Sequence, residues 1–177
     1  EGSLIGMLAC TNRPKVKSFI SIAGAGSPAY EIIEKQLITQ MTPESIQKEV
    51  AGINRSLRNG KEVAQIPPYL QTLFRPSVQP YLISWYKYNP QTVIASLKMP
   101  VLILQGKNDI QVQEEDATLL KKASSQAELK LIDKMNHVLK DCESINPQQQ
   151  MAVYNNPSLP VNDTLLNTIV QFIKRNK

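Results

Sequence analysis

The sequence is poor in the residue types that build metal centres and disulfide frameworks. It has two cysteines and one histidine among 177 residues. Cys10 and Cys142 lack the spacing of metal ligands, and Cys10 stands in an apolar stretch that is typical of a small core residue. No apolar run approaches the roughly 20 residues that a membrane-spanning helix needs. We therefore expect no metal site, no disulfide scaffold and no membrane span, while the compartment, cytoplasmic or exported, stays open.

A concentrated basic face is missing as well. Lys and Arg total 20 against 15 acidic residues, a net charge of +5, but the longest basic runs are pairs such as Lys121–Lys122 and Lys174–Arg175. Nucleic-acid binding proteins gather such residues on one face, often with aromatic side chains between them. We therefore expect no nucleic-acid partner. Hydrophobic residues at 42% and charged residues at 20% are typical of a folded globular domain.

Three short apolar runs have the character of buried strands. They are SFISIAGAG at 18–26, VLILQ at 101–105 and ELKLI at 128–132. Helical patterns at 2–10 and 114–122 alternate with them. This alternation predicts an α/β fold, in which parallel strands are flanked by helices on both faces.

The end of the chain predicts one more helix after a long loop. The segment that follows the third strand is rich in Asn, Pro and Gln and is expected to be irregular. Asn162 can cap the last helix. Its predicted apolar face consists of Leu166, Ile169, Phe172 and Ile173.

Residues 28–89 carry no convincing strand signal and predict a helical insertion. Thr42, Pro43 and Glu44 form a helix start, with a hydroxyl cap, a proline at the first helical position and an acid in the first turn. The apolar residues that follow recur at helical spacing, and Gly60 ends the pattern. An aromatic stretch with Tyr81, Trp85, Tyr86 and Tyr88 closes the region.

A carboxylate and the single histidine follow two successive predicted strands. Asp109 comes shortly after VLILQ, and His137 comes shortly after ELKLI. Loops after neighbouring parallel strands emerge side by side, so the carboxylate could orient the imidazole as in a hydrolytic triad. The alternatives are a solvated surface histidine and a turn aspartate in Lys107–Asn108–Asp109, a composition that turns favour.

These segments resemble the α/β-hydrolase family, in particular its monoglyceride-lipase-like and serine-aminopeptidase-like group. LKMPVLILQGKNDIQV is similar to the family's strand, turn and acid segment, with Gly106 to Asp109 as its G-x-x-D. MNHVLK is similar to the histidine loop. The resemblance implies a hydrolase core formed by 1–27 and 90–177, a helical cap or lid formed by 28–89, and Asp109 and His137 as catalytic acid and base.

The family's nucleophile motif, G-x-S-x-G, is absent from the sequence. EGSLIGMLAC resembles the continuation of that motif, with Gly2 as its last glycine, which puts the serine just upstream of Glu1. The backbone N–H of Glu1 would then be an oxyanion donor, and the partner of the chain would be the N-terminal half of the same fold. Ser3 follows Gly2 and is expected to be a small helix residue instead. We expect these 177 residues alone to be inactive, and an unpaired sheet edge to make them marginally stable or self-associating.

The resemblance implies a carboxylesterase or lipase-like activity on a small ester or amide, with no metal or organic cofactor. Tyr81, Trp85 and Tyr88 are candidates for lining the substrate pocket, and packing between cap and core is the alternative for each of them. Two other functions remain open. One is a dehalogenase-type relative with an aspartate nucleophile, and the other is a non-catalytic protein that binds a ligand in the same pocket.

Overall fold

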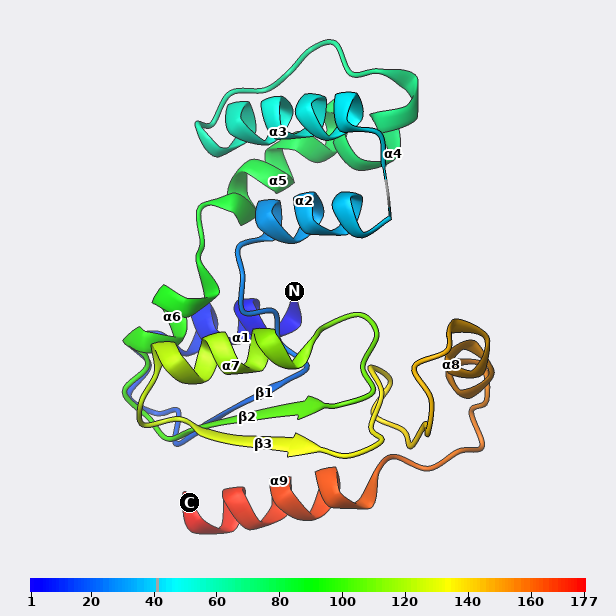
Figure 1. Cartoon of the computed structure of the whole chain (residues 1–177). Helices are drawn as coiled ribbons and strands as arrows, with labels where there is room; N and C mark the ends of the chain where they lie inside the picture. Colours follow the sequence, from blue (N-terminus) through cyan, green and yellow to red (C-terminus); the bar gives the residue numbers. More distant parts are fainter. Residues whose placement is uncertain (41) are drawn as a thin grey trace. The chain divides into compact units, whose positions relative to one another are not determined.

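The computed structural model describes residues 1–40 and 42–177 and divides the chain into two compact units. The first consists of Glu1–Gly26 together with Pro90–Lys177, and the second of Ser27–Asn89 (Figure 1). The first unit contains the sheet, and in the second every described residue is helical or irregular.

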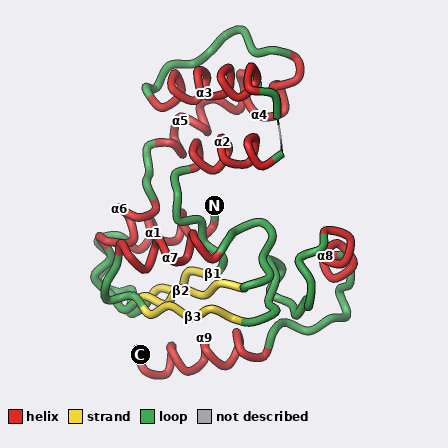
Figure 2. Tube along the Cα trace, viewed as in Figure 1, coloured by secondary structure: helices red, strands yellow, loops and turns green. Residues whose placement is uncertain are grey.

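The sheet of the first unit is parallel. Its strands are β1 (Phe19–Ile22), β2 (Val101–Gly106) and β3 (Glu128–Ile132), and their order in the described part of the chain is β1-β2-β3. Each strand lies at the segment where the sequence predicts one. Together with the flanking helices, this sheet confirms the predicted α/β class (Figure 2).

Helices cover both faces of the sheet. Three lie on one face and one lies on the other: α1 (Gly2–Cys10), α6 (Pro90–Ser96) and α7 (Glu114–Ala123) opposite α9 (Asp163–Arg175) (Figure 1). All six residues of β2 are buried, because this central strand is covered from both sides. Leu102 and Leu104 pack with Leu165 and Phe172 of α9. Burying each such side chain contributes about 1.5–3 kcal/mol.

The direction of the strands determines where the loops emerge. Because β1, β2 and β3 are parallel, their carboxyl ends meet at one edge of the sheet. The segments after β2 and β3, which contain Asp109 and His137, therefore leave the sheet next to each other. The fold thereby brings together two short segments that are well separated along the chain.

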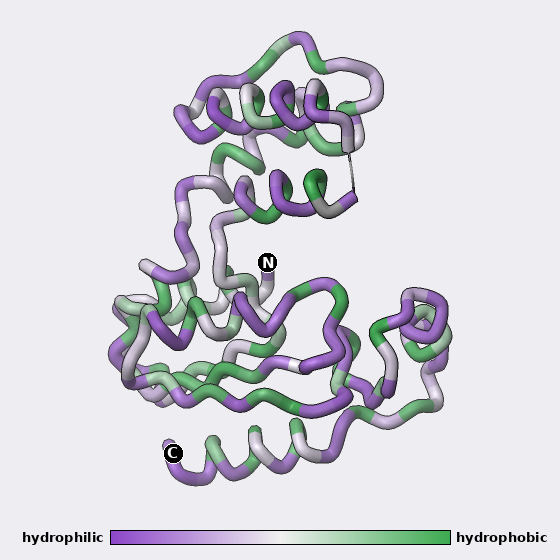
Figure 3. The backbone as a smooth tube through the Cα atoms, in the orientation of Figure 1, coloured by the Kyte–Doolittle hydropathy of each residue, from purple (hydrophilic) through white to green (hydrophobic). Residues whose placement is uncertain are grey.

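The second unit is a small helical assembly with its own core. Its helices are α2 (Ala29–Thr39), α3 (Glu44–Arg58), α4 (Gln71–Phe74) and α5 (Gln79–Tyr86), with short 3₁₀ turns at Pro68–Leu70 and Pro76–Val78. Val50, Leu57 and Phe74 are fully buried in it. Hydrophobic and hydrophilic residues alternate along α3, as expected for a helix with one buried face (Figure 3).

The ends of α3 differ in how well the sequence predicts them. The helix begins at Glu44, with Pro43 in the capping position and no side-chain cap, so the expected capping role of Thr42 is wrong. The end is as predicted. Gly60 adopts a positive φ of 73°, and its N–H donates to the carbonyl of Leu57 at 2.9 Å.

The C-terminal region corrects two predictions. The segment expected to be irregular contains α8 (Pro147–Tyr154), and the Asn146 side chain caps it by accepting hydrogen bonds from the N–H groups of Gln148 and Gln149. Asn162 caps α9 as predicted. The buried face of α9 is formed by Leu165 and Phe172, whereas Leu166 and Ile173 are 47% and 45% exposed.

Candidate active site

Gly106 sets the close approach of the two loops that carry the candidate residues. A Cβ atom at this position would lie 2.1 Å from the carbonyl oxygen of Met135, which is closer than real Cβ atoms come to backbone atoms. The residues that follow bond directly to the end of β3. The Lys107 N–H donates to the Ile132 carbonyl at 3.0 Å, and the Asn108 N–H donates to the Met135 carbonyl at 3.1 Å. The turn after β2 is therefore fastened to the start of the histidine loop.

Asp109 ends this turn as a buried carboxylate with several donors around it. The residue is 4% exposed. Its Oδ1 accepts the N–H groups of Gln111 at 2.8 Å and Val112 at 2.9 Å. Its Oδ2 accepts the side-chain amide of Gln105 at 3.2 Å and is 2.8 Å from Nδ1 of His137.

The pKa of Asp109 reflects two opposing effects. Burial raises the pKa, because the charged form loses water. The hydrogen bonds from His137 and from the N–H groups of Val112 and Gln111 lower it, and the net direction is below the ordinary value. Asp109 is therefore ionised at neutral pH and acts as a hydrogen-bond acceptor.

His137 lies in a loop that closes on itself. Met135 and Asp141 form an antiparallel bridge, the Cys142 N–H donates to the Lys134 carbonyl at 2.8 Å, and the Asn136 N–H donates to the Lys140 carbonyl at 3.0 Å. These bonds place His137 at the tip of a tight hairpin directly after β3.

The geometry assigns a proton arrangement to the pair. An ionised carboxylate can only accept, so Nδ1 of His137 carries a hydrogen and donates it to Oδ2 of Asp109. In the neutral imidazole, Nε2 is then free of hydrogen and can accept a proton. The His137 side chain is 31% exposed while that of Asp109 is 1% exposed, so the acceptor nitrogen belongs to a side chain that solvent reaches. A buried acid that orients a partly exposed base is the arrangement of a general base in acyl transfer.

Glu1 and Ser3 lie at the start of α1. Glu1 is the N-terminal flanking residue of this helix, and its carbonyl accepts the Ile5 N–H at 3.1 Å. The Ser3 hydroxyl forms a 2.7 Å hydrogen bond with the Ser21 hydroxyl of β1. A Cβ atom on Gly24 would lie 2.5 Å from the Ser3 oxygen. Ser3 thus packs the helix against the sheet, in agreement with its expected role as a small helix residue.

The predicted aromatic residues belong to the second unit, whereas Asp109 and His137 belong to the first. Tyr81 and Trp85 contact each other, with ring centroids 5.6 Å apart. Trp85 packs against the core of this unit, whereas Tyr81 and Tyr88 are 47% and 39% exposed. Trp85 is thus partly buried by packing within its own unit, whereas Tyr81 and Tyr88 are accessible to solvent.

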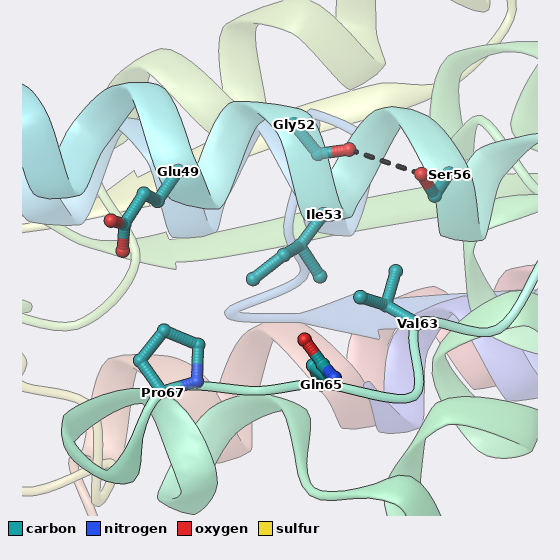
Figure 4. A pocket seen from close by; sticks show the side chains of 7 residues that line it. All are labelled: Glu49, Gly52, Ile53, Ser56, Val63, Gln65 and Pro67. Carbon is teal, nitrogen blue, oxygen red and sulfur yellow. Dashed lines mark hydrogen bonds between the residues drawn. The ribbon is translucent and has the colours of Figure 1, made fainter.

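A hollow of about 320 Å³ lies on the second unit between α3 and the segment that follows it (Figure 4). Its lining combines apolar and polar residues: Glu49, Gly52, Ile53, Ser56, Val63, Gln65 and Pro67. The Glu49 carboxylate accepts the Tyr69 hydroxyl at 2.6 Å, and the Ser56 hydroxyl donates to the Gly52 carbonyl at 3.3 Å. No imidazole lines the hollow, so it contains no carboxylate–imidazole pair like that of Asp109 and His137.

Metal-binding clusters and membrane-spanning helices are both absent from the described ranges 1–40 and 42–177. Within them, no three or more His, Cys, Asp or Glu side chains are grouped so that they could hold a metal ion. Nor do these ranges contain a helix with the length and apolar content needed to traverse a bilayer.

Sequence reasoning missed Gln105, the side chain that donates to Asp109 from within β2. Its signal was a polar residue at the end of the otherwise apolar run VLILQ. A buried strand residue of that kind needs a hydrogen-bond partner, which is a reason to look for one nearby.

Comparisons with known proteins give similarities in structure only. No protein-family model matches the chain, and no curated protein matches its sequence. Among solved structures, an alpha/beta fold family hydrolase from Bacillus anthracis is 14% identical, with a TM-score of 0.46, over 86% of this chain and 63% of that one. Est1E from Butyrivibrio proteoclasticus is 16% identical, with a TM-score of 0.45, over 95% of this chain and 58% of that one.

The alpha/beta hydrolase MGS-MChE2, from a metagenome of lagoon sediments, is 20% identical, with a TM-score of 0.45, over 86% of this chain and 56% of that one. The chain thus spans less than two thirds of the length of each of these structures. Similarities at this level assign no activity, which has to be argued from the site itself.

Proposed function

We propose that this chain supplies the acid and the base of a serine hydrolase of the α/β-hydrolase fold, and that the whole protein is a carboxylesterase or lipase-like enzyme that acts on a small ester. The observation that carries the proposal is the 2.8 Å hydrogen bond between His137 Nδ1 and the buried Asp109 carboxylate. A solvated surface histidine would not need a buried carboxylate with three further donors. A turn aspartate would not need a histidine from the next loop.

In the proposed mechanism, His137 Nε2 accepts the proton of a serine hydroxyl while the serine oxygen attacks the ester carbonyl. Asp109 holds the imidazole in the required tautomer and stabilises the imidazolium that forms. His137 then donates that proton to the leaving alcohol, which gives an acyl-enzyme. Water, activated by His137 in the same way, hydrolyses the acyl-enzyme and regenerates the serine.

The serine has to come from residues outside these 177, because the sequence contains no G-x-S-x-G. We propose that it lies immediately upstream of Glu1 and that the backbone N–H of Glu1 contributes to the oxyanion hole. The first unit is then part of the hydrolase core, and the second is a cap whose Tyr81, Trp85 and Tyr88 contribute to the substrate pocket.

The experiment is an assay of the complete protein that contains this chain, with a fluorophosphonate probe for activated serines and a short-chain p-nitrophenyl ester as substrate. We expect the probe to label one serine upstream of Glu1 and His137→Ala to abolish both labelling and turnover. We expect the 177 residues alone to give neither, since loss of the nucleophile of a serine hydrolase costs about 10⁶-fold in turnover. Ester turnover by these residues alone that disappears in His137→Ala would contradict the proposed origin of the nucleophile.

The other outcomes distinguish the remaining functions. An aspartate in place of the serine, with haloalkane turnover and no probe labelling, would identify a dehalogenase-type enzyme. The absence of both reactions, together with saturable binding of an ester or amide, would identify a ligand-binding protein. Either result would overturn the esterase proposal.

A further inference from the structure

Gln105 is a fully buried polar side chain in the central strand. It is 0% exposed, and its neighbours in β2 are apolar apart from Gly106. Burying a primary amide in such surroundings costs free energy unless hydrogen bonds replace those to water. The partners of this amide therefore indicate why the position is polar.

The amide nitrogen of Gln105 binds both the carboxylate and the turn of the acid loop. It donates to Oδ2 of Asp109 at 3.2 Å, to the Val112 carbonyl at 2.8 Å and to the Gly106 carbonyl at 3.1 Å. An amide nitrogen has two hydrogens, so these three acceptors share them. The Oε1 atom of Gln105 has no hydrogen-bond partner among the described residues.

This unequal distribution fixes the orientation of the amide. If the amide were turned over, Oε1 would face Oδ2 of Asp109, and two acceptors would repel each other. The nitrogen therefore faces the carboxylate although the oxygen on the other side is left without a partner. The Asp109 carboxylate gains a hydrogen-bond donor, and the free-energy cost is the buried Oε1 atom of Gln105 that lacks a partner.

With Gln105 in place, Asp109 accepts from four directions. Two backbone N–H groups bind Oδ1, and Gln105 and His137 bind Oδ2. The Gln105 amide also bonds to the Val112 carbonyl, while the Val112 N–H bonds to Asp109. Both oxygens of the carboxylate and the Val112 peptide of its loop are thus hydrogen-bonded. Rotation of the carboxylate would break several of these bonds together.

We propose that Gln105 is a positioning residue of the Asp109–His137 pair: it fixes the Asp109 carboxylate so that Oδ2 faces His137 Nδ1. Gln105 acts through Asp109 and contacts no reacting atom. The inference rests on the proposed function, since the pair orients a base only if the whole protein is a hydrolase. The geometric part of it can be tested in the 177-residue chain itself.

The test uses the fact that His137 is the only histidine of the sequence. Labelling histidine with ¹⁵N gives one imidazole, whose ¹⁵N shifts report the tautomer and whose Nδ1–H exchange with water reports the bond to Asp109. In Gln105→Met, which keeps the length of the side chain but removes its donor, we expect this exchange to accelerate about tenfold, as for loss of one hydrogen bond to a charged group. Gln105→Glu, whose carboxylate repels Asp109, is a second variant with the same expected direction.

The matched control is Gln79→Met in the second unit. Gln79 is also 0% exposed, and within the described part of the chain its amide bonds to backbone groups of Val63 and Phe74. We expect a comparable loss of thermal stability from it and less than a twofold change in Nδ1–H exchange. Equal acceleration in the Gln79 and Gln105 variants would show a general loss of stability and overturn the proposal.

Asp109→Asn separates the two ideas. If this variant leaves the tautomer and exchange of His137 unchanged, the Asp109–His137 pair itself is refuted, and the proposed function with it. If Asp109→Asn changes them and both Gln105 variants remain within twofold of the unsubstituted chain, only the positioning role of Gln105 is refuted.

Discussion

In the proposed mechanism Asp109 and His137 have unequal roles, and the difference can be measured. In Asp109→Asn an amide replaces the carboxylate, so the imidazole loses both its orienting acceptor and the charge that stabilises the imidazolium. We expect turnover of the complete protein to fall about 10⁴-fold, as when the acid of a triad becomes an amide. Ester hydrolysis under saturating substrate measures it, with KM expected to change little. A variant with more than a tenth of the original kcat would show that Asp109 is not the acid.

The lowered pKa of Asp109 predicts a pH dependence of stability. Burial is the largest single effect and raises the pKa, but the hydrogen bonds from His137, Val112 and Gln111 together lower it below its value in the unfolded chain. The ionised group therefore contributes stability above an unfolded pKa of about 4, and this contribution is lost as the pH falls through the folded pKa.

Urea denaturation of the parent chain and of Asp109→Asn across the acidic pH range measures this contribution of Asp109 to stability. We expect the difference in unfolding free energy between the two proteins to shrink as the pH falls below about 4. A difference that stays constant across this range would mean that Asp109 has the same pKa in the folded and unfolded chains.

At the scale of strands and helices, two glycines give opposite predictions for the same substitution. A Cβ atom on Gly106 would lie 2.1 Å from the Met135 carbonyl, whereas one on Gly52 in the middle of α3 would meet nothing within 4 Å. We expect Gly106→Ala to destabilise the chain by about 1–3 kcal/mol through overpacking between β2 and the histidine loop.

Gly52→Ala, in contrast, should stabilise by about 0.5–1 kcal/mol, because alanine loses less backbone freedom than glycine in a helix. Thermal or urea denaturation of both variants measures the pair. Equal effects would mean that the close contact at Gly106 is relieved without cost.

The strands and the Asp109–His137 pair could be predicted from local features of the sequence. The strands are short apolar runs between turn residues, and the two polar residues follow neighbouring strands. The buried face of α9 could not be predicted in the same way. Leu165 and Leu166 both fit the helical spacing, and only packing against β2 selects Leu165. The start of α8 had a signal in Asn146 followed by Pro147, a cap and a first-turn proline, which the polar composition of the segment obscured.

The role of Gln105 illustrates what a linear pattern does not contain. Its residue type shows that a buried partner must exist, but several polar groups follow it in the sequence. The choice of Asp109 depends on the bend of the turn after β2, which brings the carboxylate back toward the strand. That bend is a property of the loop as folded.

At the scale of the whole chain, exposed apolar groups predict self-association. Leu166, Val170 and Ile173 of α9 are 47%, 47% and 45% exposed and lie at helical spacing along one flank. The opposite flank is polar, and Arg175 on it binds Glu128 of β3 at 2.9 Å. The outer edge of β1 pairs with no strand in the described part of the chain. Such edges and apolar stripes favour association between molecules.

Sedimentation velocity over a range of concentrations measures this association. We expect the 177-residue chain to show a mass that increases with concentration and Val170→Lys to reduce that increase. Thr168→Lys, on the same helix but away from the apolar flank, is the control and should change it little. A strictly monomeric parent chain would contradict the expectation.

The hairpin around His137 has a consequence for how the protein can vary. Its ends are joined by the Met135–Asp141 bridge and the bond from Cys142 to Lys134, and Asn162 ties it to the start of α9 by donating to the Leu139 carbonyl at 2.8 Å. The entropy cost of closing a longer loop between the hairpin and α9 grows only slowly with the number of residues in the loop. We therefore expect an insertion among the exposed residues 157–161 to leave the bonds that close the hairpin intact, which makes this stretch a suitable position for a tag or a sensor domain.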